Sequence, residues 1–188
     1  MTACHMGVEY MPTGTFFRLP EEKRMRLVES AWEEFTHISY ADVSINKIIQ
    51  AAGIPRGSFY QYFDGKEDLF FYLLDDVRNH FIRTLKSFLL DVDGDLFSLP
   101  MLAYDQFLQR RERGDLMPRR CIQILRINPG MDMFQTFSKP PFFLPDELFP
   151  LIDTAQFRCR DRNFVESAFF LSIMCLISVI MDTFAHMD

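Results

Sequence analysis

Residues 44–63, SINKIIQAAGIPRGSFYQYF, limit how this chain can fold more than any other segment. Apolar residues in the first half recur at three- and four-residue spacing, which predicts a short helix over residues 44–52: Ile45, Ile48, Ile49 and Ala52. Ser44 stands at the N-cap position, and Gly53 favours the left-handed turn that ends such a helix. A second helix is predicted over residues 56–62, because the fixed φ of Pro55 suits a helix start. Two short helices joined by a glycine-containing turn are typical of a helix-turn-helix unit.

The second helix of this unit carries side chains suited to reading DNA. Phe59 and Phe63 are four residues apart and are predicted to pack inward. On the opposite face, Arg56 can donate two hydrogen bonds to guanine, and Gln61 can bond either an adenine edge or a phosphate. Gly57 lets the protein backbone approach the DNA closely. Neighbouring hydroxyls and a lysine at the next helix N-terminus suit phosphates. We therefore predict these DNA-binding residues: Ser44, Arg56, Gly57, Ser58, Tyr60, Gln61, Tyr62 and Lys66.

Further helices are predicted along the rest of the chain. Residues 20–36, 66–91 and 99–113 repeat apolar positions at helical spacing, and residues 163–186 form a last, strongly apolar helix. Residues 128–150 are interrupted by five prolines and are predicted to be irregular. Since no segment alternates as a strand does, the predicted fold is all-α.

The helix-turn-helix and its flanks share a detailed pattern with one family. The residues that carry the pattern are Ala31, Phe35, Tyr40, Ser44, Ile45, Ile48, Ala51, Ala52, Gly53, Gly57, Ser58, Phe59, Tyr60, Tyr62, Phe63, Lys66 and Glu67. On these, residues 27–69 resemble the DNA-binding region of the tetracycline-repressor (TetR) family of bacterial regulators. The run Phe-Tyr-x-Tyr-Phe followed by Lys-Glu makes the resemblance specific, because a generic helix-turn-helix does not require it.

The resemblance implies an organisation for the whole chain. Members of the family have a three-helix head and a fourth helix leading to a variable helical ligand-binding domain, and they bind double-stranded DNA at a palindromic operator as homodimers. We accordingly expect a disordered tail over residues 1–15, a DNA-binding domain over 16–66 and an effector-binding and dimerisation domain over 67–188. Two positions depart from the pattern: Ser39 replaces a common glycine, and Pro55 replaces the serine that caps the recognition helix.

The last helix is predicted to form the dimer. From Ala168 to Met181 only Ser172 and Ser178 are polar, and a helix that is apolar all round must be buried all round. That run is shorter than the roughly 20 residues that span a bilayer, so we expect no membrane association. The alternative is a central core helix within one subunit.

A surplus of aromatic residues between the head and the last helix predicts a pocket for a small apolar or amphipathic effector. The candidate lining residues are Phe81, Phe88, Met101, Tyr104, Phe107, Phe134, Phe137 and Met174. Two alternatives remain, namely control by a partner protein and constitutive DNA binding. Arginines near Gly114 either complement a helix C-terminus or bind an anionic effector.

Composition and motifs argue against several other classes of protein. The net charge is −6, which disfavours a protein that coats nucleic acid non-specifically. The four cysteines are widely spaced, so no zinc or redox motif is predicted, and no secretory signal is visible; a cytoplasmic location follows. No catalytic motif or phosphate-binding glycine loop occurs, so we expect no enzyme activity, no cofactor and no metal.

Overall fold

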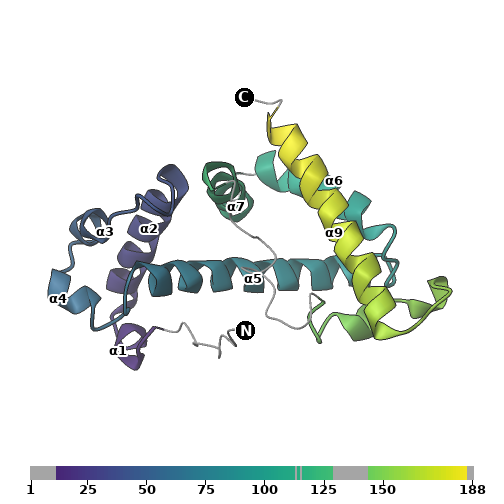
Figure 1. Cartoon of the computed structure of the whole chain (residues 1–188), viewed down its shortest axis with the longest axis horizontal. Helices are drawn as coiled ribbons and strands as arrows, with labels where there is room; N and C mark the ends of the chain where they lie inside the picture. Colours follow the sequence, from purple (N-terminus) through teal and green to yellow (C-terminus); the bar gives the residue numbers. More distant parts are fainter. Residues whose placement is uncertain (1–11, 113, 115, 129–143, 186–188) are drawn as a thin grey trace, which may run out of the picture. The chain divides into compact units, whose positions relative to one another are not determined.

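The computed structural model describes residues 12–112, 114, 116–128 and 144–185. Over these residues the secondary structure is helical, with no strand, as the sequence predicts (Figure 1). The α-helices are α1 (Gly14–Phe17), α2 (Glu21–His37), α3 (Ile45–Ala52), α4 (Arg56–Phe59), α5 (Lys66–Asp91), α6 (Leu99–Glu112), α7 (Leu116–Ile127) and α9 (Arg162–Ala185). Two single 3-10 turns, Phe149–Leu151 and Thr154–Gln156, lie between α7 and α9.

The chain divides into two compact units. The first, called the head below, comprises Met1–Asp76 together with Gln123–Pro129, and the second, the helical unit, comprises Val77–Ile122 and Gly130–Asp188. Both α5 and α7 therefore contribute residues to each unit. The predicted boundary after residue 66 was too early, because the first turns of α5 belong to the head.

An aromatic core holds the head together. Trp32 and Phe35 of α2 are almost fully buried, and α2 packs along α3. Phe16 of α1 is completely buried, with its ring centroid 4.9 Å from that of Phe63 and 5.2 Å from that of Tyr72. The expected tail is therefore too long, since α1 begins at Gly14; residues 1–11 lie outside the described residues. The sequence pattern does not predict α1, because a helix of four residues is too short to show a periodic apolar pattern. The packing of Phe16 stabilises this helix instead.

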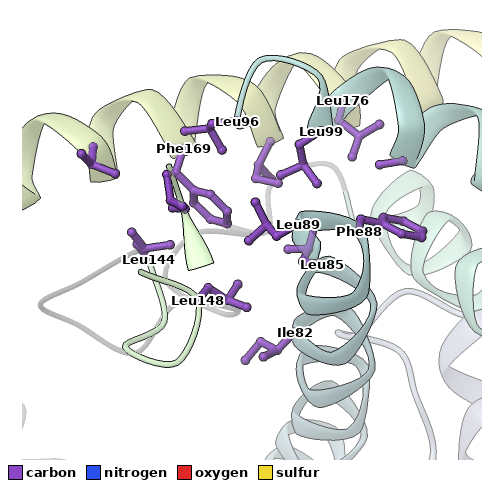
Figure 2. Close-up of a cluster of buried hydrophobic side chains, with 14 of the residues drawn as sticks. Ile82, Leu85, Phe88, Leu89, Leu96, Leu99, Leu144, Leu148, Phe169 and Leu176 are labelled. Carbon is purple, nitrogen blue, oxygen red and sulfur yellow. The ribbon is translucent and has the colours of Figure 1, made fainter. Parts of the chain in front are cut away.

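The helical unit has its own apolar core, built where α5, α6, α9 and residues 144–157 meet (Figure 2). Its buried residues are Ile82, Leu85, Phe88, Leu89, Leu96, Leu99, Ala103, Leu144, Leu148, Ile152, Phe157, Val165, Phe169, Ile173 and Leu176. The turn between α5 and α6 joins this core through Gly94, whose carbonyl accepts a hydrogen bond from Asp153 N at 3.0 Å. The loop after α7 is thereby tied to the end of α5.

The helix α7 was missed by the sequence analysis. Pro118 favours irregular structure in the middle of a segment, but here it lies in the first turn of a helix, where its missing N–H has no acceptor to lose. Ile122 and Ile124 are buried along this helix. Gly114 precedes α7 with φ +77°, which matches the predicted end of α6.

The last helix, α9, is buried along one side only. Val165, Phe169, Ile173 and Leu176 face the core of the helical unit. By contrast, Leu171 is 63% exposed, Val179 48% and Phe164 45%. A 22-residue stretch of α9, Arg162–Thr183, is long and apolar enough to cross a membrane by length and composition, with a mean hydropathy of 2.2 and 22% of it buried. The sequence-based expectation concerned the run from Ala168 to Met181, and the stretch that meets this criterion extends beyond that run at both ends.

Candidate DNA-binding surface

The turn between α3 and α4 has the geometry that the glycine predicts. Gly53 adopts φ +65°, and Ile54 N donates to Ile49 O at 2.9 Å, closing the end of α3. Pro55 precedes α4 with φ −60°, and its carbonyl accepts from Ser58 N at 2.9 Å. Proline in place of a capping serine thus still starts the helix, because the backbone carbonyl alone provides the first acceptor.

The regular part of α4 is shorter than predicted. It ends at Phe59, and the next residues continue as tight turns in which Gln61 N donates to Ser58 O at 3.1 Å and Tyr62 N to Phe59 O at 2.9 Å. These i to i+3 bonds wind the chain more tightly than an α-helix does. Phe63 N nonetheless donates to Phe59 O at 3.0 Å, an i to i+4 bond, so Phe63 keeps the direction that its four-residue spacing predicts.

One face of α4 is exposed and the other is fully buried. Phe59 and Phe63 are completely buried, which confirms that they pack inward. The exposed residues, which we call the DNA-reading face, are Arg56, Gly57, Tyr60 and Gln61. A Cβ added at Gly57 would meet nothing within 4 Å, so this chain's own packing does not require glycine there. That open space is what a close approach by an external molecule needs.

Tyr62 lies elsewhere than predicted. Its side chain is only 8% exposed, and its ring centroid lies 6.3 Å from that of Phe16. Tyr62 lies three residues after Phe59 and directly before Phe63, on the buried side that these two phenylalanines share. Thr13 reinforces this packing, since its N–H donates to Tyr62 O at 3.0 Å and its hydroxyl donates to Gln61 O. Tyr62 therefore belongs to the core of the head and not to its exposed surface.

Ser44 and Lys66 border the helix-turn-helix with different bonding from that expected. The Ser44 hydroxyl makes no cap bond to α3, and its backbone N–H donates to Glu34 Oε1 at 3.2 Å. The Lys66 ammonium donates to Tyr40 O at 2.7 Å and Ala41 O at 3.0 Å, and it lies 4.8 Å from the centroid of the Tyr40 ring. An ammonium has three N–H donors, so one remains for another acceptor.

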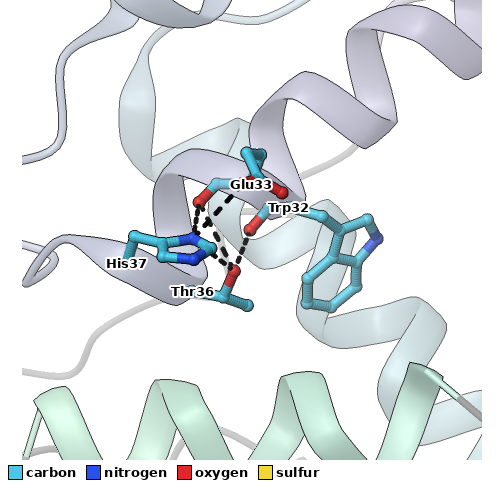
Figure 3. A network of polar contacts seen from close by, with 4 residues as sticks. All are labelled: Trp32, Glu33, Thr36 and His37. Carbon is cyan, nitrogen blue, oxygen red and sulfur yellow. Dashed lines mark hydrogen bonds and ion pairs between the residues drawn. The ribbon is translucent and has the colours of Figure 1, made fainter.

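The end of α2 explains why Ser39 can replace the common glycine (Figure 3). Thr36 Oγ1 donates to Trp32 O at 2.7 Å, and His37 Nδ1 lies 2.7 Å from Glu33 O, which requires the proton on Nδ1. The residue after the helix, Ile38, has φ −123° and is extended. The chain thus leaves α2 in an extended conformation, and Ser39 does not adopt the positive φ that would favour glycine.

The turn between α4 and α5 is closed by a buried carboxylate. Asp68 is 6% exposed, and its Oδ2 accepts from Asp64 N at 3.1 Å. Burial raises the pKa of the Asp68 carboxyl above its ordinary value, despite the opposing effect of this hydrogen bond. The bond fixes the direction in which α5 leaves the DNA-reading face.

Comparison with known proteins places this geometry in a family. The sequence profile described as bacterial regulatory proteins, tetR family, matches residues 27–73. A crystal structure of a TetR family transcriptional regulator from Chloroflexus aurantiacus is 30% identical in sequence, with a TM-score of 0.51, and the match covers 92% of this chain and 78% of that one. The chain belongs to the TetR family of transcriptional regulators.

Curated relatives support the TetR assignment over a shorter region. The transcriptional regulator AcuR of Cereibacter sphaeroides is 36% identical over 76 residues, which are 40% of this chain and 34% of that protein. The HTH-type transcriptional regulator SAB2452 of Staphylococcus aureus is 32% identical over 88 residues, 47% of each chain. The matches thus span about a third to a half of these relatives' lengths. All are regulators and none is an enzyme, in agreement with the absence of catalytic motifs from the sequence.

The structure does not gather the predicted effector residues into one group. Phe134 and Phe137 lie outside the described residues, Met101 is 68% exposed and Phe81 is 37% exposed. Phe107 is buried and Met174 half-buried. The other two belong to the helical unit: Phe88 is part of its buried core, and Tyr104 packs against that core. Met101 is thus a surface residue in the single chain.

Polar partners cover Phe88 and Tyr104. The Arg110 guanidinium lies 5.6 Å from the centroid of the Phe88 ring and donates to Thr84 Oγ1 at 3.4 Å. Tyr104 Oη lies 2.9 Å from Thr183 Oγ1, which links α6 to α9. An effector that reaches these two aromatic residues must displace or exploit such bonds.

Proposed function

We propose that this TetR family member is a repressor that binds a palindromic DNA operator as a homodimer and leaves it when a small apolar or amphipathic ligand binds the helical unit. The observation that carries the proposal is the division of α4 into two faces. Phe59 and Phe63 anchor the helix in the head, and Arg56, Gly57, Tyr60 and Gln61 remain exposed for base edges and phosphates.

Each exposed group has a role in this proposal. The Arg56 guanidinium donates two parallel hydrogen bonds to guanine, and the Gln61 amide bonds adenine. The hydroxyls of Tyr60, Ser58 and Ser44 contact phosphates and set the register of the head on the duplex. Lys66 uses its third N–H on a phosphate while its other two hold the α2–α3 loop.

The exposed apolar stripe on α9 supports a homodimer. Phe164, Leu171 and Val179 lie seven and eight residues apart, so they share one side of the helix, and each is close to half exposed or more. Such a stripe is costly in water and is removed from it when a second copy packs against it. A two-fold dimer places two heads on the two halves of a palindromic operator.

Repression and release by a ligand rest on more general arguments. The HTH-type transcriptional repressor DhaR of a Mycobacterium strain is 34% identical to this chain over 68 residues. The aromatic residues of the helical unit match the apolar lining of small-molecule sites. A ligand releases DNA only if it binds one arrangement of the two heads more tightly than the other.

Control by a partner protein is the second candidate. Phe97 is 63% exposed and Met101 is 68% exposed at the start of α6, and large exposed apolar side chains also suit protein contacts. Purification from the native host separates the candidates: a bound small molecule favours the first and a stoichiometric protein favours the second.

Selection of genomic DNA tests the proposed function most directly. The purified protein is mixed with fragments of the source genome, and bound fragments are sequenced and footprinted. We expect a recurring palindrome with half-sites about one helical turn, roughly 34 Å, apart or at a multiple of it. Uniform recovery of all fragments, or an asymmetric footprint, would contradict sequence-specific binding by a dimer.

A further inference from the structure

Several hydrogen bonds hold the loop between α2 and α3, residues 38–44. Asp42 N and Val43 N both donate to Ser39 O, at 2.9 and 3.1 Å, and the Ser39 hydroxyl donates to Asp42 Oδ2 at 2.7 Å. At its far end, Ser44 N donates to Glu34 Oε1. These hydrogen bonds hold the loop in one conformation and so determine where α3 begins.

A residue distant in sequence also holds this loop. Asn128, directly after α7, accepts a hydrogen bond through Oδ1 from Tyr40 N at 2.8 Å. Its Nδ2 donates to Ile124 O at 2.8 Å, and its own backbone N–H donates to the same carbonyl at 3.1 Å. Because Nδ2 faces a carbonyl and Oδ1 faces an N–H, both ends of the amide have complementary partners.

The bonds on the two sides of Tyr40 act together. Asn128 holds the Tyr40 N–H, and Lys66 of α5 holds the Tyr40 carbonyl. The Tyr40 ring packs against Phe70 of α5, with centroids 4.9 Å apart, and stacks on Phe35 of α2 at 6.3 Å. Tyr40 is therefore the point at which α2, α5 and the end of α7 meet within the head.

The position of the α2–α3 loop matters for DNA binding because α3 starts where the loop ends. The loop ends at Ser44, where α3 starts, and α3 packs on α2 and on α4. A shift of the loop therefore shifts the helix that supports the DNA-reading face. Since α7 begins in the helical unit and ends in the head, Asn128 joins this loop to a helix that both units share.

We propose that Asn128 is a positioning residue for operator binding, whose side-chain amide fixes the α2–α3 loop and thereby the orientation of α3 and α4. The inference rests on the proposed DNA binding. Asn128 itself touches no DNA in this account. It acts through Tyr40, because the hydrogen bond from Tyr40 N to Asn128 Oδ1 holds the backbone of the loop.

The test compares Asn128→Ala with Asn128→Asp in the full chain, using the operator fragment recovered from the genomic selection. Asn128→Ala removes this acceptor and should weaken operator binding roughly tenfold, the order expected for the loss of one hydrogen bond. The salt dependence of binding should stay unchanged, because no charged group is altered. Amide hydrogen exchange in residues 38–44 should accelerate.

Asn128→Asp keeps an acceptor oxygen for the Tyr40 amide but loses the Nδ2 donor to Ile124 O, so exchange at the Tyr40 amide should lie between the rates of the wild type and Asn128→Ala. Gln123→Ala removes a different amide from the same helix and serves as the control, with affinity and exchange as in the wild type. A purely structural role would lower the melting temperature of Asn128→Ala while operator affinity and loop exchange stayed at wild-type values, and that result would overturn the inference. Failure of the wild-type protein to bind any fragment would instead refute the proposed function.

Discussion

At the scale of single residues, Arg56 carries the clearest chemical prediction. Arg56→Ala should cost about 1–3 kcal/mol of operator binding and relax the preference at one base position in each half-site. Arg56→Lys is the matched control, because it keeps the charge and loses the planar pair of donors. Binding measured on operators altered one base pair at a time distinguishes the two variants. A phosphate role would leave base preference intact in both and would be rescued by lysine.

Gly94 and Gly114 form a natural pair for measuring backbone constraint. Both have φ +77°, but a Cβ at Gly94 would lie 2.4 Å from Leu151 O and 2.6 Å from Asp153 N, whereas one at Gly114 meets nothing within 4 Å. Gly114→Ala should therefore cost about 1–2 kcal/mol from the left-handed conformation alone. Gly94→Ala should cost a further 1–3 kcal/mol or so, because backbone atoms cannot yield easily. Equal unfolding free energies of the two variants in urea would disprove the contact.

The same residue scale shows where sequence reasoning succeeds and where it stops. Phe59 and Phe63 were placed correctly because their four-residue spacing is local information. Tyr62 was misplaced although its three-residue spacing from Phe59 already puts it on the buried side, where it packs on Phe16, 46 residues earlier in the sequence. Neither Thr13 nor Asn128 shows any local pattern, since each acts through a hydrogen bond to a residue far away in the sequence.

At the scale of elements, helix ends with strong local signals were predictable. Both ends of α5, Lys66–Asp91, follow from the turn residues that flank it, Asp64 and Gly65 before it and Asp93 and Gly94 after it. The helix α7 was not predictable in this way, because Pro118 disfavours a helix interior and only its position in the first turn makes it compatible. Tertiary packing determines where α7 begins, and so places Pro118 in its first turn.

The start of α6 gives a prediction about pH. Asp95 accepts from Ser98 Oγ at 2.6 Å and Phe97 N at 2.9 Å, and these hydrogen bonds, led by that from Ser98, lower its pKa below the ordinary value of 3.8. A lowered folded-state pKa means that this stabilisation is present above the unfolded-state pKa and is lost as pH falls through the folded-state value. Wild-type protein should therefore lose more stability than Asp95→Asn between about pH 5 and 3. Asp93→Asn in the same turn controls for net charge, and parallel melting curves of wild type and Asp95→Asn across this range would contradict the assignment.

The exposed side of α9 gives a prediction about assembly. Leu171→Glu should leave the fold of one subunit intact, because Leu171 is 63% exposed there. In a dimer it would bury an unpaired charge, which costs roughly 3 kcal/mol or more and so weakens association by about a hundredfold. Ile177 is a poorer test site, since it packs against the core of its own subunit. Leu90→Glu, at a 59% exposed position on α5, is the control for a surface charge. Light scattering that finds Leu171→Glu as dimeric as Leu90→Glu would move the interface away from this stripe.

At the scale of the whole molecule, α5 and α7 matter because each belongs to both units. In the proposed function, a ligand in the helical unit influences the head through either helix. The residues that carry the family resemblance all lie in the head, and the helical unit carries no motif beyond its apolar pattern. The residues that shape the helical unit are chosen by packing, and packing partners cannot be identified from the order of the residues alone.

The effector itself is the last prediction. Among the predicted lining residues, Phe88 is part of the core of the helical unit and Tyr104 packs against it. The Arg110 guanidinium lies over the Phe88 ring, and the Tyr104 hydroxyl bonds Thr183. A ligand that binds there at about 100 times its dissociation constant should stabilise the protein by about 2.7 kcal/mol. The same ligand should release operator DNA, because DNA and ligand favour different arrangements of the two heads. A thermal-shift screen of apolar and amphipathic compounds, followed by operator release with each hit, measures both effects.

Tyr104→Phe keeps the ring and removes the hydroxyl, so it should weaken the response to polar-headed compounds while leaving operator affinity unchanged. Compounds that stabilise the wild type and Tyr104→Phe equally, without releasing DNA, would place the effector elsewhere; an empty screen together with a protein that co-purifies in equal amount would favour control by that partner.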